Sequence, residues 1–139
     1  MTSLDNPLLV PAVNGVIVVR SIEGKDIEDV KTAFDTFRSA LEFPDYFGEN
    51  VNAFRDCVAD LSWMHADVVW IVIQNADLIP VAEPSARIDW LPRALGDAIE
   101  SLNGEPDPDF RVELRVVLVC RPEAAGRVRA LWGQLGLVV

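Results

Sequence analysis

The sequence predicts an α/β fold in which a small parallel sheet packs against helices. Three short apolar runs rich in β-branched residues, at 16–19, 68–73 and 114–120, have the composition of strands. Stretches with apolar residues at helical spacing separate the runs, and strands joined in this way pair in parallel through right-handed crossovers. The 139 residues are half hydrophobic and contain no repeat or linker, so we expect a single domain over 1–139 with a buried core.

The N-terminal third is predicted to contain a strand followed by a helix. Residues 1–14 have the composition of an irregular lead-in, and the strand at 16–19 is expected to end at the polar pair 20–21. Asp26 has a side chain suited to an N-cap, and apolar residues repeat at helical spacing after it for about four turns. The stripe of this first helix consists of Ile27, Val30, Phe34, Phe37 and Leu41.

A turn and a second helix are predicted between residues 43 and 61. Pro44 lacks a backbone donor and disfavours helix at the residue before it, so the first helix should end there. Gly48 suits a position that needs a positive φ or close approach by a partner. Asn50 is a favourable N-cap for a helix over 50–61. The apolar stripe of that helix is Val51, Phe54, Val58 and Leu61, with Cys57 beside it.

The second half of the chain is predicted to alternate strands and helices. The run 68–73 is uniformly apolar, as expected of a central strand covered on both faces. Asp89 can cap a third helix that Gly104 ends, and residues 105–109 form an acidic turn before the last strand. A final helix is expected over 122–135, with the stripe Val128, Leu131, Trp132 and Leu135.

Residues 43–57, FPDYFGENVNAFRDC, resemble the signature of the barstar family of small intracellular ribonuclease inhibitors. The resemblance implies a three-stranded parallel sheet packed with helices over a core of about 15–120. The extra C-terminal helix, about 122–135, would be an extension that covers a sheet edge or forms a dimer contact. The matching residues are Pro44, Tyr46, Phe47, Gly48, Asn50, Val51, Ala53, Phe54, Asp56 and Cys57.

The resemblance also implies a set of partner-binding residues. Asp56 corresponds to the family aspartate that enters the phosphate site of the nuclease, and Tyr46 and Gly48 correspond to contact residues. The family's partner surface further includes acids on the helix before the third strand, where Asp97 and Glu100 are candidates. The complete predicted set on the signature is Tyr46, Gly48, Asn50, Asn52, Arg55 and Asp56.

Two positions depart from the family pattern. The family often has a second aspartate where this chain has Asn52, and a tryptophan where it has Arg55. Both changes make the surface less negative, and Arg55 is expected to pair with Asp56 or Glu49 in the free protein. The departures favour a different target or a weaker contact than the usual guanyl-specific ribonuclease.

Charge indicates a basic protein partner. The net charge is −10, and residues 42–60 contain five acids and one base. Such a chain would repel nucleic-acid phosphates but would attract a cationic cleft over long range. The C-terminal arginines are either a second contact or scattered surface residues; they are Arg111, Arg115, Arg121, Arg127 and Arg129.

The remaining composition favours a cytoplasmic binding protein without a cofactor. Cys57 and Cys120 are interpreted as two small buried residues rather than a disulfide, and one histidine with two distant cysteines is no zinc pattern. His65 is expected to be structural or to face solvent rather than act as a general base. We expect no signal peptide, no membrane span and no enzyme activity.

Three functional hypotheses follow. The first is an immunity-type inhibitor of a basic ribonuclease or related toxin, which blocks the nuclease active site with an acidic helix and loop. The second is a barstar-fold module for protein binding, self-association as a homodimer or regulation that has lost ribonuclease inhibition. The third is an enzyme of unknown type, for which the chain offers little.

Overall fold

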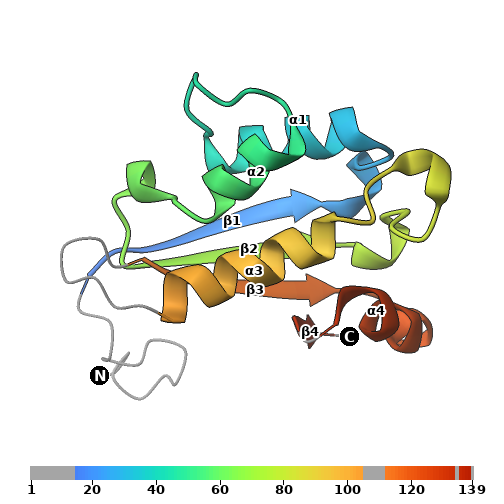
Figure 1. Cartoon of the computed structure of the whole chain (residues 1–139). Coiled ribbons are helices and arrows are strands. Elements are labelled where there is room, and N and C mark those ends of the chain that lie inside the picture. Colours follow the sequence, from blue (N-terminus) through green and yellow to red (C-terminus); the bar gives the residue numbers. More distant parts are fainter. Residues whose placement is uncertain (1–14, 105–111, 134, 139) are drawn as a thin grey trace, which may run out of the picture.

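The computed structural model describes residues 15–104, 112–133 and 135–138 (Figure 1). The lead-in predicted for 1–14 and the turn predicted for 105–109 lie outside these ranges. The strands are β1 (Ile17–Glu23), β2 (Val68–Gln74), β3 (Glu113–Val119) and β4 (Gly136–Val138), and the α-helices are α1 (Val30–Leu41), α2 (Val51–Val58), α3 (Leu91–Gly104) and α4 (Ala125–Trp132).

The strands form one parallel sheet in the order β1-β2-β3-β4. The three predicted strands and their parallel pairing are confirmed, with β2 at the centre between β1 and β3. The fourth strand was not predicted, because three residues near the chain end are too few to show a periodic pattern. It pairs with β3 from Val117 to Val119 and extends the sheet by one short strand.

The C-terminal helix is present but shorter than the predicted 122–135. A 3₁₀ turn over Pro122–Ala124 precedes α4, which ends at Trp132. Gly133 follows with φ +70° and ψ −132°, a backbone conformation that leaves the helix and that glycine adopts most readily. The predicted extension therefore supplies α4, and the residues just after it add β4 beside β3.

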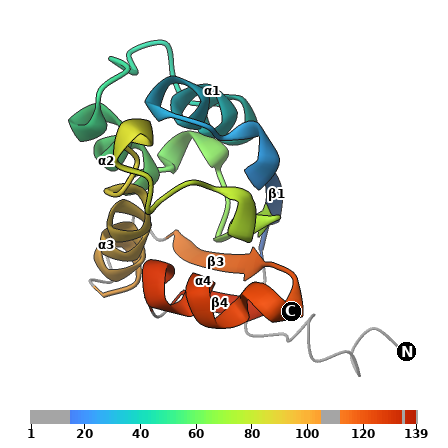
Figure 2. The same ribbon diagram turned by 90° about the vertical axis from the view of Figure 1, so that its right-hand side faces the viewer.

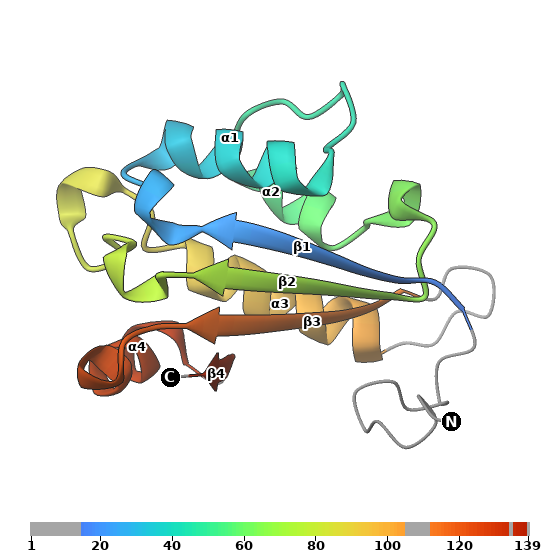
Figure 3. The same ribbon diagram turned by 180° about the vertical axis from the view of Figure 1, so that it is seen from behind.

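Helices α1, α2 and α3 cover one face of the sheet, and α4 lies beyond the carboxyl end of β3 (Figures 1 and 2). The side chains of Val69, Ile71 and Ile73 point to the covered face and are fully buried. Seen from behind, no described helix crosses the opposite face of the three long strands (Figure 3). The described helices do not provide the cover on both faces that was predicted for β2, since α1, α2 and α3 all pack on the same side.

Several element boundaries differ from the sequence prediction. β1 continues through the polar pair 20–21 to Glu23, because an edge strand tolerates polar side chains and Arg20 pairs with Glu42 at 2.9 Å. Asp26 lies in a 3₁₀ turn, and the N-cap of α1 is instead Asp29. The second helix ends at Val58 rather than at residue 61.

Candidate functional site

An aromatic cluster fixes helix α2 on the covered face of the sheet. Phe54 of α2 is fully buried, and its ring centroid lies 5.1 Å from that of Phe37 and 5.2 Å from that of Trp90. Edge-to-face aromatic contacts of this kind add stabilisation beyond their buried area. Because α1 and the segment before α3 both pack on Phe54, the outer face of α2 is held in one orientation.

The loop ahead of α2 is held by Arg38 of α1. Its guanidinium carbon lies 5.1 Å from the centroid of the Phe47 ring, and its Nη2 lies 3.0 Å from Glu49 Oε1. Glu49, with φ 50°, is the residue of this turn in the left-handed region. Gly48 does not have a positive φ, so that alternative is wrong, and its other predicted role, leaving space for a partner to approach closely, stays a prediction.

Asn50 caps α2, as the sequence predicts. Its Oδ1 accepts a hydrogen bond from the Ala53 amide at 2.8 Å, which satisfies one of the free donors of the first turn. Its Nδ2 donates to the Gly48 carbonyl at 3.3 Å. One side chain therefore ties the loop to the start of the helix.

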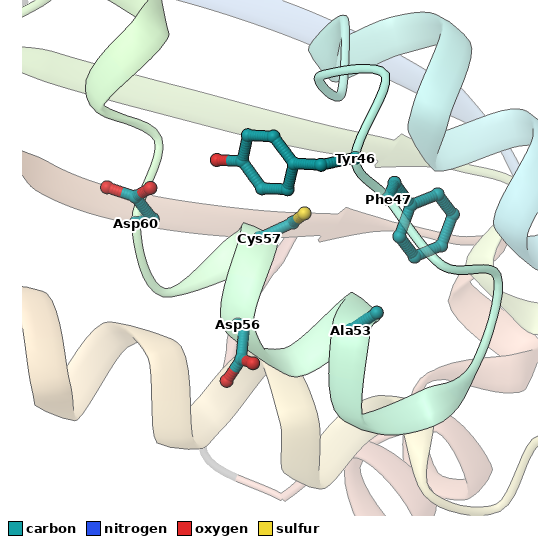
Figure 4. Close-up of a pocket in the computed structure, with 6 residues that line it drawn as sticks. All are labelled: Tyr46, Phe47, Ala53, Asp56, Cys57 and Asp60. Atoms are coloured by element: carbon teal, nitrogen blue, oxygen red, sulfur yellow. The ribbon is translucent and has the colours of Figure 1, made fainter.

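Tyr46 and Asp56 both line a small pocket beside α2, although the Asp56 carboxylate points away from the tyrosine ring (Figure 4). The pocket has a volume of about 160 Å³ and is lined by Tyr46, Phe47, Ala53, Asp56, Cys57 and Asp60. Tyr46 is 71% exposed, and Asp56 is also exposed, so both side chains are available to another molecule. Of the six predicted residues, Gly48, Asn50, Asn52 and Arg55 do not line this pocket.

Asp60 is a residue of this pocket that the predicted set does not include. It follows α2 and lies four residues after Asp56, and its carboxylate lies on the Tyr46 side of the pocket while that of Asp56 points the other way (Figure 4). The i, i+4 spacing of Asp56 and Asp60 is the sequence pattern that could have indicated Asp60 as a further site residue.

The pocket shifts the pKa values of two of its side chains. Desolvation and then the Asp60 carboxylate raise the pKa of the Tyr46 phenol. Burial and then Asp60 and Asp56 raise the pKa of the Cys57 thiol.

Arg55 pairs with a residue of α3 rather than with either predicted partner. Its Nη1 lies 3.2 Å from Asp97 Oδ2, whereas Glu49 pairs with Arg38. The prediction of an Arg55 pair with Asp56 or Glu49 is therefore wrong, because the side chain turns across the α2–α3 contact. Within the described part of the chain, no salt bridge includes Asp56, and its carboxylate faces solvent.

The candidate acids of α3 lie next to this surface. Asp97 and Glu100 are both exposed, and Asp97 meets α2 through Arg55. The same two acids line a groove of about 900 Å³ that runs along α3 toward Trp132 of α4. The acidic surface thus continues from α2 onto α3.

Three of the C-terminal arginines bond to other parts of the fold. Arg121 bonds to Asp77 through both Nε and Nη2 at 2.8 Å, and Arg127 donates to the Asp77 carbonyl at 3.2 Å. Asp77 is buried, so these contacts attach the C-terminal segment to the turn after β2. Arg115 pairs with Glu113, and Arg111 lies outside the described residues. Arg121, Arg127 and Arg129 are exposed, so a second contact through these arginines stays a prediction.

The other candidate side chains have structural positions. Cys57 and Cys120 are free and buried, which confirms their interpretation as small core residues. His65 is exposed at the end of a 3₁₀ turn. Among the described residues, no group of three or more His, Cys, Asp and Glu side chains could hold a metal ion, and no helix has both the length and the apolar character needed to cross a membrane.

Comparison with known proteins agrees with the geometry. A family model described as Barstar (barnase inhibitor) matches residues 17–116, which is most of the chain. "Putative ribonuclease inhibitor YrdF" of Bacillus subtilis (strain 168) is 40% identical over 54 residues, which cover 39% of this chain and 56% of that relative. The match thus spans little more than half the length of the relative. The chain belongs to the barstar family.

Proposed function

We propose that this protein binds a basic ribonuclease or related toxin and blocks its active site with the surface formed by α2 and the loop before it. Asp56 is the anchor of this surface, and Tyr46, Gly48, Asn50, Asn52 and Arg55 surround it. The observation that carries the proposal is the exposed Asp56 carboxylate, which is in no salt bridge among the described residues and projects from a helix held by aromatic packing.

Electrostatics suits this role. A ribonuclease cleft that binds RNA carries Lys and Arg for the phosphates, and carboxylates on a preformed surface can take the place of those phosphates. The net charge of −10 would increase the rate of encounter with a cationic partner, and salt would reduce that rate. Inhibition then needs only occlusion of the cleft and no chemical step.

The pocket beside Asp56 suits one basic side chain of the partner. The Tyr46 ring, Phe47 and Ala53 offer apolar surface for its aliphatic stem, while Asp60, near the tyrosine hydroxyl, offers an acceptor for its charged end. A cation over the tyrosine ring would gain a further favourable contact. The Tyr46 phenol is neutral at neutral pH even at its ordinary pKa of 10.0, which desolvation and then Asp60 raise further, so it can donate a hydrogen bond.

An immunity role and a cytoplasmic location belong to the same proposal. Two free, buried cysteines are consistent with a reducing compartment, where a cell would hold an inhibitor of its own secreted nuclease. The acidic charge argues against direct binding of nucleic acid, because phosphates would be repelled.

An RNA-cleavage assay with barnase, the ribonuclease that the family description names, tests the proposal. Wild-type protein should inhibit cleavage, and Asp56→Ala should weaken inhibition by about 30-fold or more, which corresponds to about 2 kcal/mol of binding free energy. Glu123→Ala removes an exposed acid from the 3₁₀ turn before α4 and should leave inhibition unchanged. Equal inhibition by the wild type and Asp56→Ala would refute the role of Asp56.

The two departures from the family pattern support a second candidate, a protein-binding module that has lost ribonuclease inhibition. Asn52 is exposed on α2 without the charge of an aspartate, and Arg55 neutralises Asp97. The double variant Asn52→Asp, Arg55→Trp separates the candidates in the same assay. Inhibition that arises only in the double variant favours the second candidate, whereas inhibition by the wild type favours the first.

A further inference from the structure

The sheet has one face that no described helix covers (Figure 3). The pairing of Val19 with Trp70 and of Trp70 with Arg115 puts their side chains on this same face, since paired residues of parallel neighbours share a face. Six partly or largely exposed apolar side chains lie on it, beside the buried Val68 and five polar side chains, Ser21, Glu23, Gln74, Glu113 and Arg115. We call it the open face; the six apolar residues are Ile17, Val19, Trp70, Val72, Val117 and Val119.

The open face is accessible as well as apolar. Val19 is 58% exposed and Ile17 is 39% exposed, while Trp70, Val72, Val117 and Val119 are partly exposed. On the opposite face, the strand residues Ile71 and Leu114 are fully buried under the helices. Parallel sheets occur almost only with both faces covered, so this face is the expected place for a further layer.

The open face also differs from the rest of the protein in charge. Its charged pair, Glu113 and Arg115, is joined at 2.6 Å, and the Arg115 guanidinium lies over the Trp70 ring at 5.6 Å. The pair is neutral overall, although the whole chain carries −10. Two copies that approach through the acidic helical side would repel each other, whereas on the open face only Glu23, at the end of β1, adds a charge to the neutral pair.

We propose that the open face is a homodimer interface, in which the sheets of two copies pack face to face about a two-fold axis. Such an interface is self-complementary, because the apolar strands of each copy meet those of the other. Face-to-face sheets pack about 10 Å apart with interdigitated side chains. Each copy supplies one acid and one base, so Glu113 of one copy can meet Arg115 of the other across the axis.

The arrangement leaves the proposed nuclease-binding surface accessible in both copies. Helix α2 lies on the covered side of the sheet, and the dimer forms on the opposite side (Figure 2). Three strands of seven residues give a footprint of roughly 300 Å² per copy, or about 600 Å² in total, which is below the size of standard specific interfaces and fits only a weak, transient dimer. The dimer should therefore dissociate on dilution rather than behave as an obligate assembly.

Sedimentation velocity of the full chain over a wide concentration range tests the dimer. The wild type should shift from monomer to dimer as concentration rises. Val19→Lys should weaken dimerisation at least tenfold, because it puts a charge at the exposed edge of the open face. Leu78→Lys is the matched control, since Leu78 is 48% exposed but lies in the turn after β2, and it should dimerise like the wild type.

A charge exchange makes the test specific for a second copy. Arg115→Glu gives the open face two acids, and Glu113→Arg gives it two bases, so each variant alone should be monomeric. An equimolar mixture should dimerise again, because each acid of one variant faces a base of the other. Mixtures that remain monomeric while the wild type dimerises would exclude this face as the interface.

A wild type that stays monomeric at all concentrations overturns the proposal. If Val19→Lys then also lowers the midpoint of urea unfolding, the face is covered from within the chain, and residues 1–14 become the occupant to examine. No arm of the experiment contains a nuclease, so its outcome does not depend on the proposed inhibition.

Discussion

The helical side and the open face of the sheet are two exposed regions with opposite chemistry. The helical side presents the carboxylates of Asp56 and Asp60 around a pocket of about 160 Å³. The open face presents apolar side chains such as Val19 and a neutral ion pair. Net charge of one sign favours a different molecule of opposite sign, whereas a neutral apolar face can accept an identical molecule. The contrast separates a surface for another protein from a surface for a second copy.

Strand β2 shows the same contrast at single-residue scale. Ile71 and Val72 are neighbours in sequence, yet Ile71 is fully buried and Val72 is partly exposed. Side chains of a strand alternate between faces, so the two residues report on the two environments separately. A uniformly apolar strand therefore need not have equally buried faces.

The largest effect is expected from truncation on the covered face. Ile71→Ala should lower the free energy of unfolding by about 4 kcal/mol, because it removes buried methyl groups and leaves a cavity. Val72→Ala should lower it by less than about 1 kcal/mol in the monomer, because its side chain is already partly hydrated. Urea denaturation at low protein concentration measures both values. Equal losses from the two variants would contradict the one-sided burial of the sheet.

An intermediate effect is expected from the cap of α2. Asn50→Ala should lower the free energy of unfolding by about 1 kcal/mol, because the Ala53 amide loses its acceptor. Asn50→Asp keeps an acceptor oxygen and should retain most of that stability. Circular dichroism during urea denaturation measures the difference. Dimerisation should be unchanged in both variants. If Asn50→Ala abolished the dimer, the helical side and the open face would not be independent of each other.

The features predicted correctly from the sequence are those that depend on local pattern. The Asn50 cap, the apolar stripe of α2 and the three apolar runs are each encoded within a few residues. The position of Asp56 on the outer face of α2 follows from helical spacing alone. A helix N-cap needs only the side chain and the amides that follow it, so tertiary structure does not alter it.

The features that were missed depend on contacts between distant residues. Arg55 lies 42 positions from Asp97 in sequence, so no local pattern distinguishes this partner from the nearer Asp56 and Glu49. The open face of β2 depends on which side the crossover helices pack, and the composition of the strand is the same for either outcome. The N-cap at Asp29 was missed because Asp26 is equally suitable by residue type, and only Thr32 completes the capping box.

A smaller effect is expected from the pair that links α2 to α3. Arg55→Ala should change the free energy of unfolding by no more than about 0.5 kcal/mol, because both side chains are partly exposed and solvent screens the pair. The same variant removes a positive charge next to Asp56 and should speed association with barnase at low salt. Stopped-flow fluorescence measures the association rate. Slower association would mean that Arg55 itself contacts the partner.

The smallest effect concerns two carboxylates, one on each side of the sheet. Hydrogen bonds from Thr32 lower the pKa of Asp29 at the start of α1, and hydrogen bonds from Asn75 and Lys25 lower that of Glu23 at the end of β1. A lowered pKa in the folded state stabilises the protein above the unfolded-state pKa, and that stability is lost as the pH falls through the folded-state value. The thermal midpoint should therefore fall as the pH drops below the ordinary values of 4.5 for Glu and 3.8 for Asp. Asp29→Asn and Glu23→Gln should each reduce this fall slightly and by similar amounts, because both groups are exposed. If only one of the two variants reduces the fall of the thermal midpoint, only that carboxylate contributes to the loss of stability at low pH.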